Sequence, residues 1–214
     1  SYGINTNAMT SRNTSVFIWN DIAEGLYRPK PGTVTRTQGT QFYVDPYVDY
    51  LAHRGMRHTL RTRMHRQVFD NDNGQGNANT TLHAEYQVQQ RFDFFGETVA
   101  TAGVLWRQVN SDAELYLGNA DGDPHNEALT TGAYLQMDKK LFDRLALSAG
   151  VRYERFVVED AEASQPVFRA GATYRVFQAT YLRASYGQGF RFPTIGERFI
   201  STNVGNLRVY PNPD

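Results

Sequence analysis

Charge is kept off every second residue along much of this chain. The alternation is clearest in residues 145–153, where the odd positions hold Leu, Leu, Ala, Val and Tyr. Because successive side chains of a β-strand point to opposite faces, such a stretch predicts a strand with one uncharged face. About eight stretches follow the pattern that is typical of such strands. Their uncharged positions are Phe42, Val44, Pro46, Val48, Tyr50, Leu60, Thr62, Met64, Leu82, Ala84, Tyr86, Val88, Ala100, Ala102, Val104, Trp106, Ala133, Leu135, Met137, Leu145, Leu147, Ala149, Val151, Tyr153, Phe168, Ala170, Ala172, Tyr174, Val176, Thr180, Leu182, Ala184 and Tyr186.

None of these positions carries Asp, Glu, Lys or Arg, although those four types make up 21% of the chain. The intervening positions hold many charges, among them Asp49, Arg63 and Arg152. A face this polar does not suit a dry protein core, because an unpaired buried charge is costly. Both faces would be stable if lipid lay against the uncharged face and water against the charged one. The pattern therefore predicts an all-β protein, an antiparallel section of a transmembrane β-barrel.

Composition is compatible with this fold and excludes several other classes. The longest uncharged apolar runs fall far short of the roughly 18 residues of a transmembrane helix and exclude one. The mean hydropathy of −0.55 does not exclude a barrel, whose alternating strands average out to a polar value. The 22 basic and 22 acidic residues are spread along the chain, and no basic stripe points to a nucleic-acid partner. The chain has no Cys, which excludes disulfides and thiolate metal sites. Its first ten residues lack the features of a signal peptide, so we expect a mature or excised chain.

The connections between the expected strands alternate in length, which is a second and independent signal. Short periplasmic turns and long extracellular loops are typical of outer-membrane barrels. The short connections are residues 52–57, 94–97, 139–144 and 177–178, and the long ones are 70–79, 110–127, 160–166 and the chain after 187. We therefore expect an extracellular loop region with a possible short hairpin over 1–40, consecutive strands over 41–186, and a truncated extracellular loop over 187–214.

The end of the chain resembles a landmark of TonB-dependent outer-membrane receptors. In that family a strand ends in S-Y-G-x-G-F/Y-R-x-P-x-x-x-E and is followed by N-P-x-L-x-P-E. The first part is matched by Ser185, Tyr186, Gly187, Gly189, Phe190, Arg191, Pro193 and Glu197, and the second only by Asn212-Pro213-Asp214. Residues 43–69 and 135–154 also resemble strands of this family, most closely those of Bacteroidetes-type bacteria. The likeness covers nearly the whole chain.

This resemblance implies a fragment of a larger barrel of about 22 strands in the bacterial outer membrane. It implies import of a scarce nutrient, such as an iron chelate, cobalamin or an oligosaccharide, with energy transduced from the inner membrane. The implied partners are outer-membrane lipid, a small-molecule nutrient and a TonB-type energy transducer. The transducer would act through a plug domain that this chain does not contain. No cofactor and no catalytic activity are implied.

The loop after the last expected strand is the best candidate for ligand contact. It places aromatic rings among arginine side chains, a combination that suits sugars and anionic chelates. An alternative is that the landmark residues only fix the loop fold, since a landmark shared across different substrates cannot encode one substrate. The candidate ligand-binding residues are Phe190, Arg191, Phe192, Glu197, Arg198 and Phe199.

Other readings of the sequence are weaker. A soluble glycan-binding β-sandwich would use the uncharged face as a dry core. An outer-membrane barrel hydrolase would need a histidine near Ser148 or Ser185 on the inward face, and the assigned phases place none there. Residues 121–127 gather three carboxylates around His125, which a polar turn explains more simply than a bound cation. The sequence offers no set of catalytic, metal-binding or cofactor-binding residues.

Overall fold

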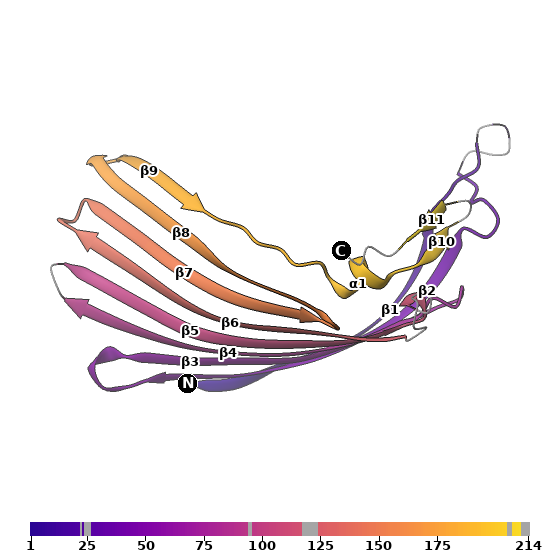
Figure 1. The fold of residues 1–214 in the computed structure, drawn as a ribbon, viewed down its shortest axis with the longest axis horizontal. Coiled ribbons are helices and arrows are strands. Elements are labelled where there is room, and N and C mark those ends of the chain that lie inside the picture. Colours follow the sequence, from indigo (N-terminus) through magenta and orange to yellow (C-terminus); the bar gives the residue numbers. More distant parts are fainter. Residues whose placement is uncertain (22, 24–26, 94–95, 117–123, 205–206, 211–214) are drawn as a thin grey trace.

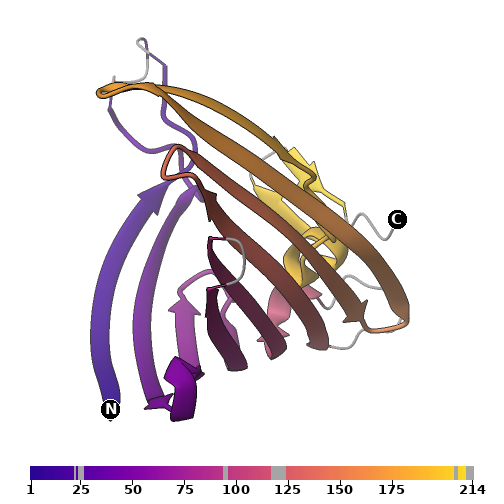
Figure 2. The same ribbon diagram turned by 90° about the vertical axis from the view of Figure 1, so that its left-hand side faces the viewer.

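Nine strands form a single antiparallel sheet in which each strand pairs with its neighbours in the chain (Figure 1). The computed structural model describes residues 1–21, 23, 27–93, 96–116, 124–204 and 207–210. The sheet curves strongly and stays open, with β1 and β9 as its edges (Figure 2). Its strands are β1 (Tyr2–Val16), β2 (Val34–Leu51), β3 (Arg57–Asn71), β4 (Asn77–Asp93), β5 (Glu97–Ala113), β6 (His125–Leu141), β7 (Leu145–Val158), β8 (Ala161–Phe177) and β9 (Thr180–Gly187).

Smaller elements lie outside the sheet. Two 3₁₀ turns are η1 (His53–Gly55) and η2 (Glu114–Tyr116), and one short helix is α1 (Ile195–Phe199). A two-stranded ribbon pairs β10 (Thr202–Val204) with β11 (Leu207–Val209). Across the part of the chain that the structure describes, no helix has the length and apolar character needed to cross a membrane.

The strand register places the uncharged positions on one face of the sheet, as predicted. Met64 pairs with Val44 on one side and with Leu82 on the other. Further along the sheet, Leu135 lies between Ala102 and Val151. Directly paired residues of neighbouring strands point to the same side, so the uncharged positions form one continuous surface.

This uncharged face is the convex one, and no other described part of the chain covers it. The helix α1 lies on the opposite, concave side (Figure 1). On the convex side the apolar side chains remain open, with exposed fractions of 54% for Val104, 48% for Leu135 and 67% for Leu182. A β-sandwich would bury these side chains under a second sheet. The sandwich prediction is therefore wrong, and the face is built to contact lipid.

Aromatic side chains gather at one end of the convex face. On five strands the predicted uncharged stretch ends in an aromatic residue on the side of the longer loops, and all of these rings are substantially exposed. Aromatic girdles at this level mark the membrane–water interface of outer-membrane barrels. The aromatic belt consists of Phe42, Trp106, Tyr153, Phe168 and Tyr186.

The prediction of a loop region over residues 1–40 is wrong for most of its length. Residues 2–16 form β1, and β2 already begins at Val34. The pairing continues outward beyond β1 and β2, where Lys30 donates its backbone N–H to the carbonyl of Ile18 (2.9 Å). The convex positions of β1 before Arg12 are uncharged but include Thr6, Ala8 and Thr10, which give a weak apolar signal. The sequence analysis therefore did not predict that β1 contributes to the lipid-facing surface.

The connections differ between the two ends of the sheet, with two exceptions to the prediction. Those expected on the periplasmic side are short, such as 142–144 and 178–179, whereas 17–33 on the other side is long. The loop expected over 70–79 is residues 72–76, no longer than residues 52–56 at the other end. The loop expected over 160–166 is instead a two-residue turn, because β8 begins at Ala161. Pro166 pairs with Tyr153 of β7 but lies beyond the part of β8 that pairs with β9. A proline is tolerated at such a local edge, where its missing N–H costs no ladder hydrogen bond.

Candidate functional site

The chain after β9 turns back over the concave face and crosses it (Figure 1). We call residues 190–202 the crossing segment. Near its end, the backbone N–H of Ser201 donates to the carbonyl of Leu115 (3.0 Å). The side-chain amide of Gln75, in the β3–β4 turn, donates to the Thr202 hydroxyl (2.6 Å). The crossing segment therefore ties the last strand of the sheet to turns that lie several strands away.

A small buried cluster holds the crossing segment to the wall. Ile195 of α1 packs with Tyr116 and with Ala113 and Val158, which point inward from β5 and β7. The Tyr116 hydroxyl shares a hydrogen bond of 2.9 Å with Ser111, so its polar end is satisfied inside the cluster. These residues were not among those selected from the sequence. The Thr194-Ile195-Gly196-Glu197 pattern of a capping box was the available signal for the helix.

The three predicted aromatic residues pack within the protein. The rings of Phe190 and Phe192 lie 5.7 and 5.9 Å from the ring of Phe156, which points inward from β7. Phe199 contacts the ring of Tyr116 edge to face at 6.5 Å. Contacts of this kind add to the stabilisation from apolar burial, so these rings have a structural role in the fold of the crossing segment.

The predicted charged residues form a local network at the start of α1. Glu197 closes a capping box with Thr194, whose backbone N–H donates to the carboxylate (2.9 Å). Arg191 forms an ion pair with the same carboxylate. The guanidinium of Arg198 lies 5.7 Å from the ring centre of Phe199. Arg191 is the most open of these side chains, with an exposed fraction of 73%. The contacts favour the alternative in which the landmark fixes the loop, and ligand contact stays a prediction.

A hollow of about 340 Å³ lies between the crossing segment and the wall. It is lined by apolar groups of Phe156, Phe192 and Ile195 and by polar groups of Arg107 and Tyr116. An apolar cavity with a few converging polar groups is the usual form of a small-molecule site. The hollow is therefore the best-formed candidate for ligand contact at the extracellular end.

Arginines of β3 are paired with carboxylates of β2 on the concave face. Arg63 makes two hydrogen bonds to Asp45 (2.7 and 2.5 Å) and lies over the ring of Tyr43. Arg57 and Arg61 both contact Asp49, at 3.1 and 3.2 Å. This part of the wall is polar but internally neutralised, so it offers little free charge to a ligand.

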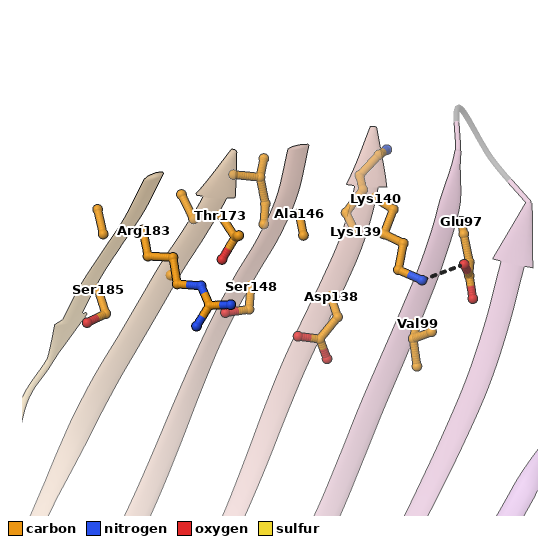
Figure 3. A pocket seen from close by; sticks show the side chains of 14 residues that line it. Glu97, Val99, Asp138, Lys139, Lys140, Ala146, Ser148, Thr173, Arg183 and Ser185 are labelled. Carbon is orange, nitrogen blue, oxygen red and sulfur yellow. Dashed lines mark hydrogen bonds and ion pairs between the residues drawn. The ribbon is translucent and has the colours of Figure 1, made fainter. Parts of the chain in front are cut away.

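The concave face at the other end of the sheet differs in its charge. Between β6 and β9, a hollow of about 450 Å³ is bordered by small side chains such as Ser148 and Ser185. Arg183 reaches across it from β9 toward the side of Asp138 (Figure 3). Within the described residues, Arg183, Arg169 and Arg175 form no ion pair. This side of the lumen wall therefore carries unneutralised positive charge. The residues that line this hollow include no His beside the two serines.

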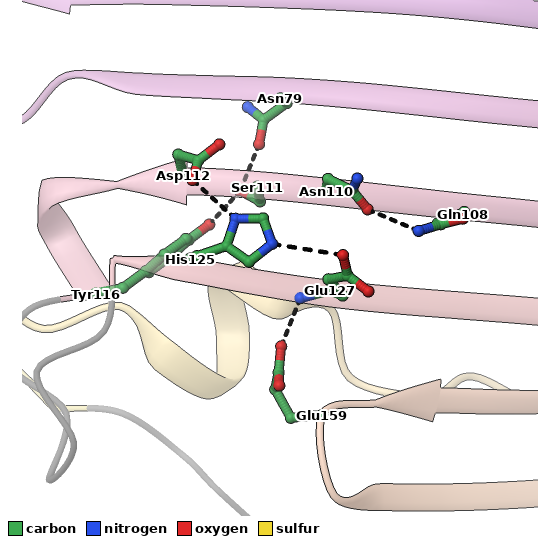
Figure 4. Close-up of polar contacts among 9 residues, drawn as sticks. All are labelled: Asn79, Gln108, Asn110, Ser111, Asp112, Tyr116, His125, Glu127 and Glu159. Carbon is green, nitrogen blue, oxygen red and sulfur yellow. Dashed lines mark hydrogen bonds and ion pairs between the residues drawn. The ribbon is translucent and has the colours of Figure 1, made fainter.

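A titratable cluster lies at the extracellular end of β6 (Figure 4). His125 contacts Asp112 through Nδ1 (2.8 Å) and Glu127 through Nε2 (3.5 Å). The hydrogen bond to Asp112 is the main cause that raises the pKa of His125. Among the residues that the structure describes, no three acidic or histidine side chains are arranged to hold a metal ion. Residues 121–123 of the proposed polar turn lie outside the described residues.

A curved antiparallel sheet with a bare, belted convex face and a polar concave face defines the wall of a membrane β-barrel. The sequence matches the family model "TonB dependent receptor-like, beta-barrel" over residues 3–214. The chain thus belongs to the TonB-dependent receptor family, as its terminal landmark predicted. No curated protein matches the sequence.

Two solved structures show the same fold. The siderophore receptor PirA from Pseudomonas aeruginosa aligns with a TM-score of 0.66 and 11% identity, over 78% of this chain and 30% of its own. The alcaligin outer-membrane receptor FauA from Bordetella pertussis aligns with a TM-score of 0.58 and 17% identity, over 87% of this chain and 32% of its own. The chain therefore spans about a third of the length of these receptors.

Proposed function

We propose that this chain is a wall section of an outer-membrane receptor that imports a scarce small-molecule nutrient. Membership of the TonB-dependent receptor family carries the proposal, and the lipid-facing surface supports an outer-membrane location. The nutrient would be an iron chelate, cobalamin or an oligosaccharide. One of the two similar structures is a siderophore receptor, which makes an iron chelate the first nutrient to test. The role is binding and transport, with no catalysis.

The energy for import would come from a TonB-type transducer acting through a plug domain outside this sequence. In such a receptor the concave face would line the lumen, with its charged side chains against water or the plug. The ligand would first touch the extracellular end, where Arg191 is exposed and the hollow beside Arg107 and Tyr116 opens.

A growth experiment on the full-length parent receptor tests this proposal. A strain that lacks the receptor gene should lose growth on one of three media, in which an iron chelate, cobalamin or an oligosaccharide is limiting. The full-length gene should restore growth only where the energy transducer is intact. Unchanged growth on all three media, or restoration without the transducer, would contradict the proposal.

A further inference from the structure

Three arginines stand above the lipid-facing surface at its extracellular end. Arg12 is the first charged residue after the uncharged convex positions of β1, and Arg66 has the same place on β3. On β2, which lies between them, Arg36 follows the polar residues Thr40 and Gln38. All three side chains are exposed on the convex side. We call Arg12, Arg36 and Arg66 the rim arginines.

The register brings two of the rim arginines close together. Arg12 pairs with Gln38, and Arg36 pairs with Thr14. Arg12 and Arg36 are thus diagonal neighbours on one face, a position in which the backbones of two residues lie about 7–8 Å apart. Arg66 lies on the other side of β2, where it pairs with Phe42 of the aromatic belt. By this register Arg66 lies six residues along β2 from Arg36, about 20 Å apart at the usual rise of a strand, so the three side chains together suit a headgroup that carries more than one phosphate.

The rim arginines form no ion pair within the described residues. Arg155, which has the same place on β7, does form an ion pair. Its Nε and Nη2 donate to the two carboxylate oxygens of Glu162 (2.6 and 2.7 Å). On the neighbouring strand and turn, Asp70 pairs with Gln38 and Asp72 accepts the backbone N–H of Arg36 (2.9 Å), but neither forms an ion pair with a rim arginine. The guanidinium groups therefore retain their donors for another partner.

We propose that the rim arginines bind a phosphate-bearing headgroup of an outer-leaflet lipid. The proposal rests on the outer-membrane location given under the proposed function. The aromatic belt places the rim at the level of the headgroups, and a guanidinium fork matches phosphate geometry. The surface below the rim is uncharged, polar at first through Thr10, Gln38 and Thr40, and mainly apolar from the level of Phe42. An amphiphile with an anionic head satisfies both parts, whereas free phosphate would leave the apolar part bare.

Binding of purified diphosphorylated lipid A to the full-length receptor in uncharged detergent tests this proposal. Inorganic phosphate and phosphatidylcholine serve as comparison ligands. The triple variant R12Q/R36Q/R66Q should bind lipid A about tenfold more weakly, since charge-assisted contacts to phosphate are lost. The matched control R169Q/R175Q/R183Q removes three arginines of the concave face and should bind like the wild type. The wild type should show no comparable binding of phosphatidylcholine or inorganic phosphate.

Three results would overturn the proposal. They are equal binding by the wild type and the rim variant, equal loss in both triple variants, or equal binding of inorganic phosphate and lipid A. Nutrient-dependent growth with the rim variant separates this inference from the proposed function. If the receptor imports its nutrient but binds lipid A no better than phosphatidylcholine or inorganic phosphate, only the lipid site is refuted. A receptor that fails every growth test refutes the transport role whatever its lipid binding.

Discussion

The two faces of the sheet use the same strands for opposite purposes. No other described part of the chain covers the convex face, and its uncharged stretches need only the surrounding lipid. On the concave face, Arg63, Glu85 and Tyr134 find partners across strands, and the crossing segment builds the only sizeable apolar cluster of the described residues. A one-residue change of register would exchange the two faces. The alternation is therefore what specifies the fold.

Substitution at adjacent residues of β6 should expose this difference most strongly. Leu135→Arg places a charge in lipid and should cost about 2–4 kcal/mol of unfolding free energy near the bilayer midplane. Gln136→Arg points the same charge into the lumen and should cost well under half as much. Unfolding of the full-length receptor in lipid vesicles with guanidinium measures both. Equal costs would show that the phase assigned to this strand is wrong.

A second prediction concerns the apolar cluster of the concave face. Phe192→Ala should cost about 2 kcal/mol, less than the ~3–5 kcal/mol of a fully buried phenylalanine, because Phe192 is half-buried. The loss should appear as faster hydrogen exchange in α1, while the β-strand amides stay protected. Phe177→Ala, in an exposed turn, is the control and should leave α1 exchange unchanged. Identical exchange in both variants would mean that the stacking on Phe156 does not hold the crossing segment.

These two sites also show how far the sequence could be read. The faces of β2–β9 follow from local alternation, which every strand displays by itself. The strand β1 was not predicted, because Thr and Ala are weak markers of an apolar face. They are nevertheless sufficient for a strand that pairs with a strongly apolar neighbour. The early start of β8 was not predicted because a strand can include Pro166 only where β9 does not pair with it. Both β1 and the start of β8 depend on the position of the strand in the sheet, which the local sequence does not reveal.

The candidate site was only partly predictable for the same reason. The landmark drew attention to residues 190–199, and these residues do lie together at the extracellular end. Their partners Tyr116 and Phe156 come from other hairpins, with no local signal that links them to the landmark. The sequence could therefore suggest ligand contact for the aromatic rings but could not show that they pack against Tyr116 and Phe156.

The Glu197 network allows the structural and ligand-binding roles of the landmark to be separated. Glu197→Ala removes both the capping box and the ion pair with Arg191, and should destabilise the crossing segment by about 0.5–2 kcal/mol. Glu197→Gln keeps a capping side chain and removes only the charge, so it should cost less. Hydrogen exchange of α1 reports stability, and ligand affinity is measured in parallel. A large affinity loss in Glu197→Gln with α1 intact would restore the ligand-binding role.

The smallest expected effect is a pH dependence at the outer edge of the convex face. Contact with Asp112 and Glu127 raises the pKa of His125, because both carboxylates favour its charged form. The stabilisation is therefore fully present below the ordinary pKa of 6.5 and is lost as the pH rises through the raised pKa. The thermal midpoint of the full-length receptor should fall slightly over that window. His125→Gln should flatten this part of the profile, and a variant that keeps the full dependence would assign it to another group.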